Sequence, residues 1–124
     1  MIKSMVGIAF DCENAKELVT FYEKLTGWKK EVENDNFSAL RTPEGILLVF
    51  QSVENYQPPI WPWEDDKPQQ MVHIDYLVEN LEEGVKHAQQ FGAKKAETQY
   101  YETEGAIVML DPAGHPFCLT VVDE

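Results

Sequence analysis

MVHIDYLVEN, residues 71–80, decides the fold once it is placed beside MVGIAFDCEN, residues 5–14. Five of the ten letters are identical at matching positions, so the chain contains a repeat with an offset of 66 residues. A repeat of this length predicts two copies of one supersecondary unit, neither of which buries its apolar face alone. At one position the copies differ in chemistry, because His73 of the second stands where the first has Gly7.

The two copies also share helix and turn signals. Each continues with Asn-x-x-Glu, at Asn14 and at Asn80, a pattern in which the Asn side chain accepts from backbone N–H groups and begins a helix. Apolar residues follow at helical spacing, and Gly27 and Gly92 are the expected helix ends. A Pro-x-Gly turn between two apolar runs, PEG in one copy and PAG in the other, predicts a hairpin near each end.

These signals predict one strand, one helix and a short antiparallel meander in each copy, which is the order βαβββ and the α+β class. Four prolines in the seventeen residues between the copies exclude a regular element there. We read residues 1–124 as one domain, with module one at 4–53, a crossover at 54–70 and module two at 71–122. The expected strands are 4–12, 28–33, 36–42, 46–53, 71–78, 94–99, 105–110 and 116–122, and the expected helices are 14–26 and 80–91.

Composition narrows the function classes. The net charge of -12 opposes binding to nucleic acid or to anionic membranes, and it favours cationic ligands if it has any role beyond solubility. No apolar run reaches the length of a membrane span, and the first residues lack the pattern of a signal peptide. The two cysteines, Cys12 and Cys118, indicate free thiols in a reducing compartment, so a cytoplasmic location is expected.

The chain resembles the vicinal oxygen chelate superfamily of glyoxalases, extradiol dioxygenases, and fosfomycin- and bleomycin-resistance proteins, most closely a glyoxalase-like subgroup. The resemblance covers nearly the whole chain, and its motifs are FYEKLTGW, PPIWPWEDDKPQQMVHID, VHIDYLVEN and DPAGHPFCL. It implies that the two βαβββ modules form a half-open barrel, and that chains pair as homodimers.

The resemblance also implies four inward positions that hold one divalent ion in the metalloenzymes of the family. The repeat places them at Gly7, Val49, His73 and Cys118. Two of these residues have no donor atom, and a histidine with a thiol is an unusual pair for Mg, Mn, Fe or Ni. Asp75 is expected to lie too far along its strand to reach the centre. We therefore expect no metal and no other cofactor, and we expect that His73 is not part of a catalytic metal site.

Strand alternation predicts which side chains face a ligand cavity. Val6 and Val72 fall on the apolar side that should face the helices, whereas Gly7, His73 and Asp75 fall on the opposite side. Polar groups that converge within apolar walls are typical of small-molecule sites. The crossover aromatics are expected to cover this cavity or simply to pack. The predicted ligand-binding residues are His73, Asp75, Gln51, Cys118, Thr120, Trp61 and Trp63.

Alternatives remain open for the histidines and for the function. His73 either lines the pocket or is a structural histidine, His87 should be exposed on its helix, and His115 should serve a turn. The first functional hypothesis is a metal-independent protein that binds an unknown small molecule. The second is a glyoxalase-like lyase or isomerase, or a dioxygenase-related enzyme, with His73 and Asp75 as candidate catalytic groups. The third is an interaction module whose cavity has filled.

Overall fold

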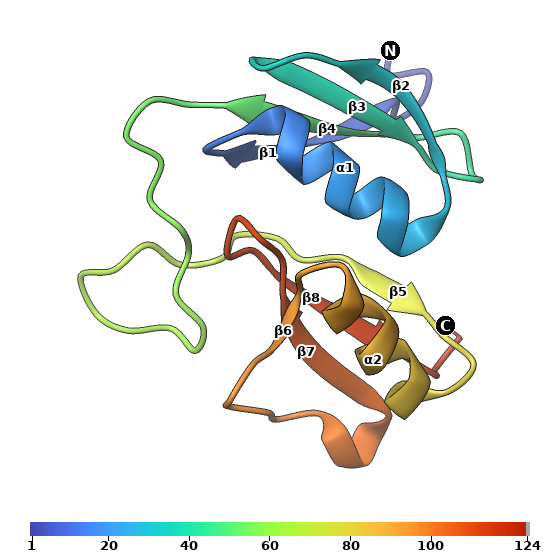
Figure 1. Ribbon diagram of the computed structural model, residues 1–124, viewed down its shortest axis with the longest axis vertical. Coiled ribbons are helices and arrows are strands. Elements are labelled where there is room, and N and C mark those ends of the chain that lie inside the picture. Colours follow the sequence, from blue (N-terminus) through green and yellow to red (C-terminus); the bar gives the residue numbers. More distant parts are fainter. Residues whose placement is uncertain (124) are drawn as a thin grey trace. The chain divides into compact units, whose positions relative to one another are not determined.

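The computed structural model describes residues 1–123, which form two compact units. The first unit is Met1–Tyr56, and the second begins at Gln57. Each unit contains one four-stranded sheet with one α-helix on one of its faces (Figure 1). This is the predicted α+β class, with one βαβββ module in each unit.

In the first unit, β1 pairs in parallel with β4, and the other neighbours in the sheet are antiparallel. The strand order is β1-β4-β3-β2, so the first and last strands of the module lie side by side at one edge. The elements are β1 (Gly7–Cys12), α1 (Ala15–Thr26), β2 (Lys29–Glu33), β3 (Phe37–Arg41) and β4 (Leu47–Ser52).

The second unit repeats this topology with the order β5-β8-β7-β6, again with a parallel pair formed by the first and last strands. The agreement of the two strand orders confirms the repeat. Among the described residues, no helix combines the length and apolar character needed to cross a membrane. The elements are β5 (Asp75–Leu77), α2 (Leu81–Gln90), β6 (Lys94–Lys95), the 3-10 helix η1 (Glu102–Glu104), β7 (Ala106–Leu110) and β8 (Pro116–Thr120).

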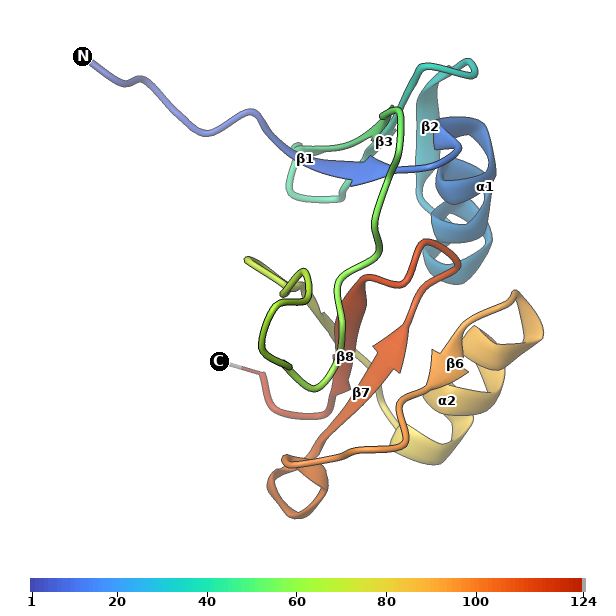
Figure 2. The ribbon, with the colours of Figure 1, turned by 90° about the vertical axis from the view of Figure 1, so that its left-hand side faces the viewer.

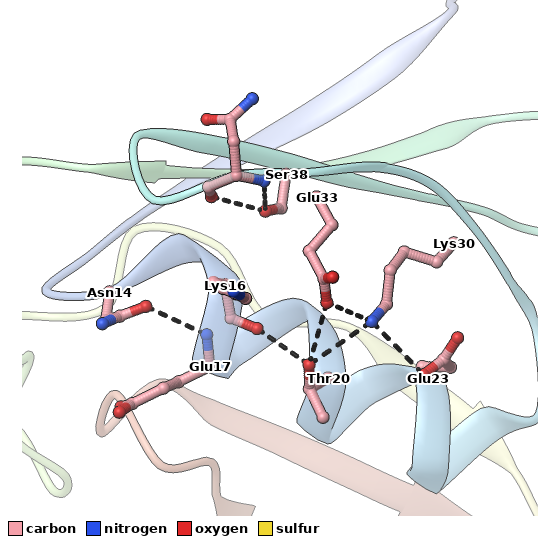
Figure 3. Close-up of polar contacts among 9 residues, drawn as sticks. Asn14, Lys16, Glu17, Thr20, Glu23, Lys30, Glu33 and Ser38 are labelled. Atoms are coloured by element: carbon pink, nitrogen blue, oxygen red, sulfur yellow. Dashed lines mark hydrogen bonds and ion pairs between the residues drawn. The ribbon is translucent and has the colours of Figure 1, made fainter.

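The helix ends follow the predicted signals. The side-chain oxygen of Asn14 accepts from the backbone N–H of Glu17 at 3.0 Å (Figure 3), and Asn80 accepts from its counterpart at 2.9 Å. Each contact satisfies one of the backbone donors that a helix start leaves without a partner. Gly27 and Gly92 follow the helices with φ of 75° and 114°, a region that favours glycine.

Each sheet is buried against its own helix. In the first unit Phe50 is fully buried, with its ring stacked on Tyr22 at 5.3 Å. In the second unit Phe117 and Leu119 of β8 are buried, and Leu119 lies within reach of Gly84 on α2. The opposite face of each sheet carries no α-helix, and this is the face on which the sequence places its candidate ligand-binding residues.

Every predicted strand is shorter in the structure, and β1, β5 and β6 differ the most from their predicted ranges. β5 begins at Asp75 instead of residue 71, and Val72 is exposed, as is Val6 before β1. The expectation that these valines face the helices is therefore wrong, because both precede the strand ladders. β6 ends at Lys95, and the N–H of Ala96 still donates to the C=O of Val108, at 3.0 Å. The side-chain amide of Gln99 then pairs with the N–H and the C=O of Val108, each at 2.8 Å.

The crossover contains no helix or ladder strand, as its prolines predict. Its one isolated bridge joins Ile60 to Gln69. The part that belongs to the second unit lies on the side of the sheet opposite α2 (Figure 2). The segment therefore contributes to the helix-free face of the second module.

Candidate functional site

The strand register of the second module brings three candidate residues to one face. Asp75 is paired with Cys118 in the parallel β5–β8 ladder, and Cys118 is paired with Val108 in the β7–β8 ladder. Paired residues of neighbouring strands point to the same side of a sheet. Thr120 lies two residues beyond Cys118 on β8 and shares that side. The face is therefore polar at one edge and apolar toward β7.

His73, Asp75 and Cys118 form a close cluster on this face. The Nε2 atom of His73 lies 3.1 Å from Oδ1 of Asp75. One nitrogen of His73, one carboxylate oxygen of Asp75 and the sulfur of Cys118 all lie within 4.8 Å of one another. The side chain of Asp75 thus turns toward both neighbours, whereas its distance from a centre shared by the four family positions stays a prediction.

The thiol of Cys118 is held in its neutral form. Burial, together with the negative charge of Asp75 and a hydrogen bond to that carboxylate, raises the pKa of Cys118 to about 11. A thiol with this pKa is a poor nucleophile near neutral pH, because the thiolate is the reactive species. In the protein alone, Cys118 therefore acts as a hydrogen-bond donor toward Asp75.

The cluster lines a pocket of about 400 Å³ within the second module. Four of the seven predicted ligand-binding residues lie together there. The pocket has carboxylates on opposite elements, Asp75 of β5 and Glu104 of η1, and the Tyr101 ring beside them. This combination gives a negatively charged hollow with an aromatic wall. The lining residues are His73, Asp75, Tyr101, Glu104, Ala106, Cys118, Thr120 and Val122.

Tyr101 and Glu104 are pocket residues that sequence reasoning missed. They lie in the stretch YYETEG, which was read only as a connection between two strands. The structure folds this stretch into η1, which ends at Gly105 with φ of 91°. Two adjacent aromatics followed by acidic residues and a glycine were the available signal, since costly aromatic side chains seldom occupy a purely solvated turn.

The crossover tryptophans occupy different environments. Trp61 packs against the buried cluster of Ala96, Val108 and Cys118, and its indole N–H donates to the carbonyl of Thr98 at 2.9 Å. Trp61 therefore covers the helix-free face next to the pocket. Trp63 is 59% exposed. A contact of either ring with a ligand remains a prediction.

The first module has a different set of groups at the corresponding positions. Gln51 belongs to this module, where its amide donates to Asp11 at 2.8 Å. Gly7 and Val49 lie on neighbouring strands of its sheet and carry no donor atoms. The hard divalent ion of the family metalloenzymes therefore lacks half of its expected ligands in this chain.

The other two histidines are placed as predicted. His87 is exposed on α2, where its ring contacts Phe91 with centroids 5.1 Å apart. The backbone N–H of His115 donates to the side chain of Asp111 at 3.0 Å, which closes the turn before β8. Neither residue belongs to the cluster around His73.

Comparisons with known structures agree with this architecture. A mutant of the fosfomycin resistance protein FosX from Listeria monocytogenes, complexed with Mn(II) and 1S,2S-dihydroxypropylphosphonic acid, superposes with a TM-score of 0.72, 14% identity, and coverage of 99% of this chain and 93% of that chain. A possible glyoxalase from Bacillus cereus gives a TM-score of 0.69 at 13% identity, with coverage of 96% and 99%. At these identities the likeness concerns the fold.

A third structure, a glyoxalase/bleomycin resistance protein/dioxygenase family enzyme from Burkholderia phytofirmans, gives a TM-score of 0.66 at 17% identity and covers 91% of this chain and 94% of that chain. No sequence among the curated proteins matches the chain. The model of the glyoxalase-like domain matches residues 7–120, which include both modules. The chain therefore belongs to the glyoxalase-like domain family, within the vicinal oxygen chelate superfamily.

Proposed function

We propose that the protein binds a small organic molecule on the helix-free face of its second module, without a hard catalytic ion such as Mg, Mn, Fe or Ni. The observation that carries the proposal is the 400 Å³ pocket, in which an imidazole, two carboxylates, a thiol and a hydroxyl stand beside an aromatic ring and two aliphatic side chains. This volume and this mixture are those of small-molecule sites. Similar folds in fosfomycin resistance and glyoxalase proteins support the same class of ligand.

The ligand class follows from the charge of the lining. Asp75 and Glu104 are anionic, His73 is the only basic residue of the lining, and Tyr101 offers a ring face. An organic cation with an aromatic or apolar part would pair its charge with the carboxylates and place its ring against Tyr101. The overall charge of -12 adds a long-range attraction for such a ligand.

An enzymatic function is the second candidate, because the His73 imidazole lies 3.1 Å from the Asp75 carboxylate. This carboxylate can orient the imidazole, so the pair could move a proton to or from a bound substrate. A glyoxalase-like lyase or isomerase, or a dioxygenase-related enzyme, would use such a step.

A melting-temperature screen in a chelating buffer separates the two candidates. Cationic aromatic amines should raise the melting temperature of the full chain, and this rise should shrink in Glu104→Gln and Asp75→Asn. Glu97→Gln removes an equal charge at an exposed position outside the pocket and should leave the rise unchanged. A response to adducts of keto-aldehydes with thiols, followed by their conversion, would instead favour the enzyme. No response to either class would contradict both.

The assembly is a separate proposal. We expect a homodimer, as family members commonly pair modules across chains. Light scattering at micromolar concentration should give twice the mass of 14.2 kDa, and a mass of one chain would contradict the expectation.

A further inference from the structure

Three side chains of the types that can bind a metal ion converge within the second module. His73 lies just before β5, Asp75 is the first residue of β5, and Cys118 is the middle residue of β8. Their nearest donor atoms lie within 4.8 Å of one another, and the His73–Asp75 pair lies at 3.1 Å. A tetrahedral zinc ion separates neighbouring ligand atoms by about 3.3 to 3.6 Å. Small side-chain rotations are therefore enough to place the three atoms around one ion.

The donor set selects the class of ion. Imidazole, thiolate and carboxylate are the ligands of zinc, whereas Mg and Mn prefer sites built from oxygen. A catalytic zinc ion usually has three protein ligands and one position open to water or substrate. The family positions in the first module, Gly7 and Val49, are not required for such a site.

The surroundings of His73 contain a group suited to orient it. The side-chain nitrogen of Gln70 lies 3.5 Å from Nδ1 of His73, and the other end of that amide, Oε1, is buried without a hydrogen-bond partner within residues 1–123. A half-turn of the amide exchanges its two ends. The oxygen would then accept Nδ1–H of His73 and leave Nε2 free for an ion, the usual arrangement of a ligating histidine.

From these observations we propose that His73, Asp75 and Cys118 bind one zinc ion, with its remaining coordination position open to the pocket. On binding, the ion displaces the thiol proton of Cys118 to solvent, and a sulfur–zinc bond forms. The Asp75 carboxylate and the resulting thiolate neutralise the double positive charge, and Glu104 adds a third negative group to the pocket. The site goes beyond the proposed binding of an organic molecule and does not depend on it.

The test is metal binding by the tag-free full chain. The chain is stripped with a chelator and then titrated with zinc by calorimetry, and bound zinc is measured by elemental analysis after dialysis. One ion per chain is expected. Cobalt(II) in place of zinc should give a thiolate-to-cobalt charge-transfer band in the near ultraviolet, which reports directly on a sulfur ligand.

Variants identify the ligands. Cys118→Ser should abolish the charge-transfer band, and Cys118→Ser, His73→Gln and Asp75→Asn should each weaken zinc binding by about 100-fold or more. Two matched controls should bind as the natural chain does: Cys12→Ser, which changes the buried thiol of the first module, and His87→Gln, which changes the exposed histidine of α2. If the serine variant does not fold, His73→Gln still tests the site, since that side chain is 37% exposed.

Several results would overturn the proposal. These are the failure of the stripped chain to take up zinc at micromolar free concentration, binding that persists unchanged in Cys118→Ser and His73→Gln, and binding that is lost in Cys12→Ser or His87→Gln. Because the screen for organic ligands is carried out in a chelator, a negative result with zinc leaves that proposal standing, and the reverse also holds.

Discussion

The helix-free faces of the two modules share a topology and differ in the side chains that they carry. At the repeat position of His73 the first module has Gly7, where an added Cβ would lie 3.2 Å from the carbonyl oxygen of Leu47. The backbone of Gly7 is fixed next to Leu47 because β1 pairs with β4 over six residues, beginning at Gly7 itself. The corresponding β5–β8 ladder has three paired residues and begins at Asp75, so His73 lies outside it. The length of the parallel ladder thus decides which module has room for a large donor side chain.

Polar groups are also used differently in the two modules. In the first, Lys30 of β2 contacts Glu33, lies 3.5 Å from Glu23 of α1, and donates to Thr20 at 3.5 Å, so the cluster ties the helix to the edge of the sheet (Figure 3). In the second, the cluster of His73, Asp75 and Cys118 faces a pocket. One copy of the repeat uses its charged groups for packing, and the other places them at the wall of a pocket.

The largest predicted loss of stability comes from truncating the buried residue at the centre of each module's core. Phe50 is fully buried, with 0% accessible surface, and the rings of Tyr22 and Phe10 stack on it with centroids at 5.3 and 5.9 Å. Phe50→Ala should lower the free energy of unfolding by about 4 kcal/mol, and Leu119→Ala, the repeat equivalent, by about 3 kcal/mol. Urea unfolding measures both. Phe37→Ala, at a side chain 42% exposed, is the control, and an equal loss there would contradict the comparison.

The second prediction transplants the histidine. Gly7→His should lower the free energy of unfolding by about 2 kcal/mol, because its Cβ must displace the Leu47 carbonyl, an overpacking effect. It should add no zinc binding, since no thiol or carboxylate stands at Val49. Ala9→His is the matched control, because Ala9 is exposed on the same strand and already has a Cβ. If both variants are equally stable, the close approach at Gly7 does not exclude a side chain.

The third prediction concerns a feature that the modules share. Asn14 and Asn80 accept from the backbone N–H groups of Glu17 and Glu83 at 3.0 and 2.9 Å. Asn14→Ala and Asn80→Ala should each cost about 1 kcal/mol of the free energy of unfolding. Asn→Gly at the same positions should cost less, because glycine also tolerates the cap conformation. Losses that differ by more than a factor of two would show that the caps are not equivalent.

The repeat explains how much of this could be predicted from the sequence. The helix starts at Asn14 and Asn80 and the helix ends at Gly27 and Gly92 were predictable. The same capping residues occur in both copies of the repeat, and each acts on backbone groups close to it in the sequence. The common face of His73 and Asp75 was also predictable, but the 3.1 Å contact between their side chains was not. A strand pattern gives the face of a residue, whereas the direction in which a carboxylate turns depends on its neighbours.

Two further parts of the site depended on contacts that sequence patterns do not contain. Glu104 reaches the pocket because it lies in η1. The sequence of this stretch, YYETEG, predicts only a connection between two strands. After β6 the side-chain amide of Gln99 pairs with the backbone of Val108 on β7, a contact that no periodicity in the sequence indicates. Both are tertiary effects on short segments, where local preference is weakest.

The smallest predicted effect is the pH dependence of the first-module cluster. A hydrogen bond from Lys30 lowers the pKa of Glu33 from its ordinary value of 4.5. A carboxyl whose pKa is lower in the folded state stabilises the fold above its ordinary pKa, and this contribution is lost as the pH falls through the lowered value. The melting temperature of the natural chain should therefore exceed that of Glu33→Gln at neutral pH, and the difference should disappear in acid. Glu13→Gln changes an exposed carboxyl outside the cluster and should show no such trend. Because Glu33 is exposed and Lys30 is half-buried, added salt should shrink the difference at neutral pH. A difference that survives in acid and in salt would mean that Glu33 acts through packing and not through its charge.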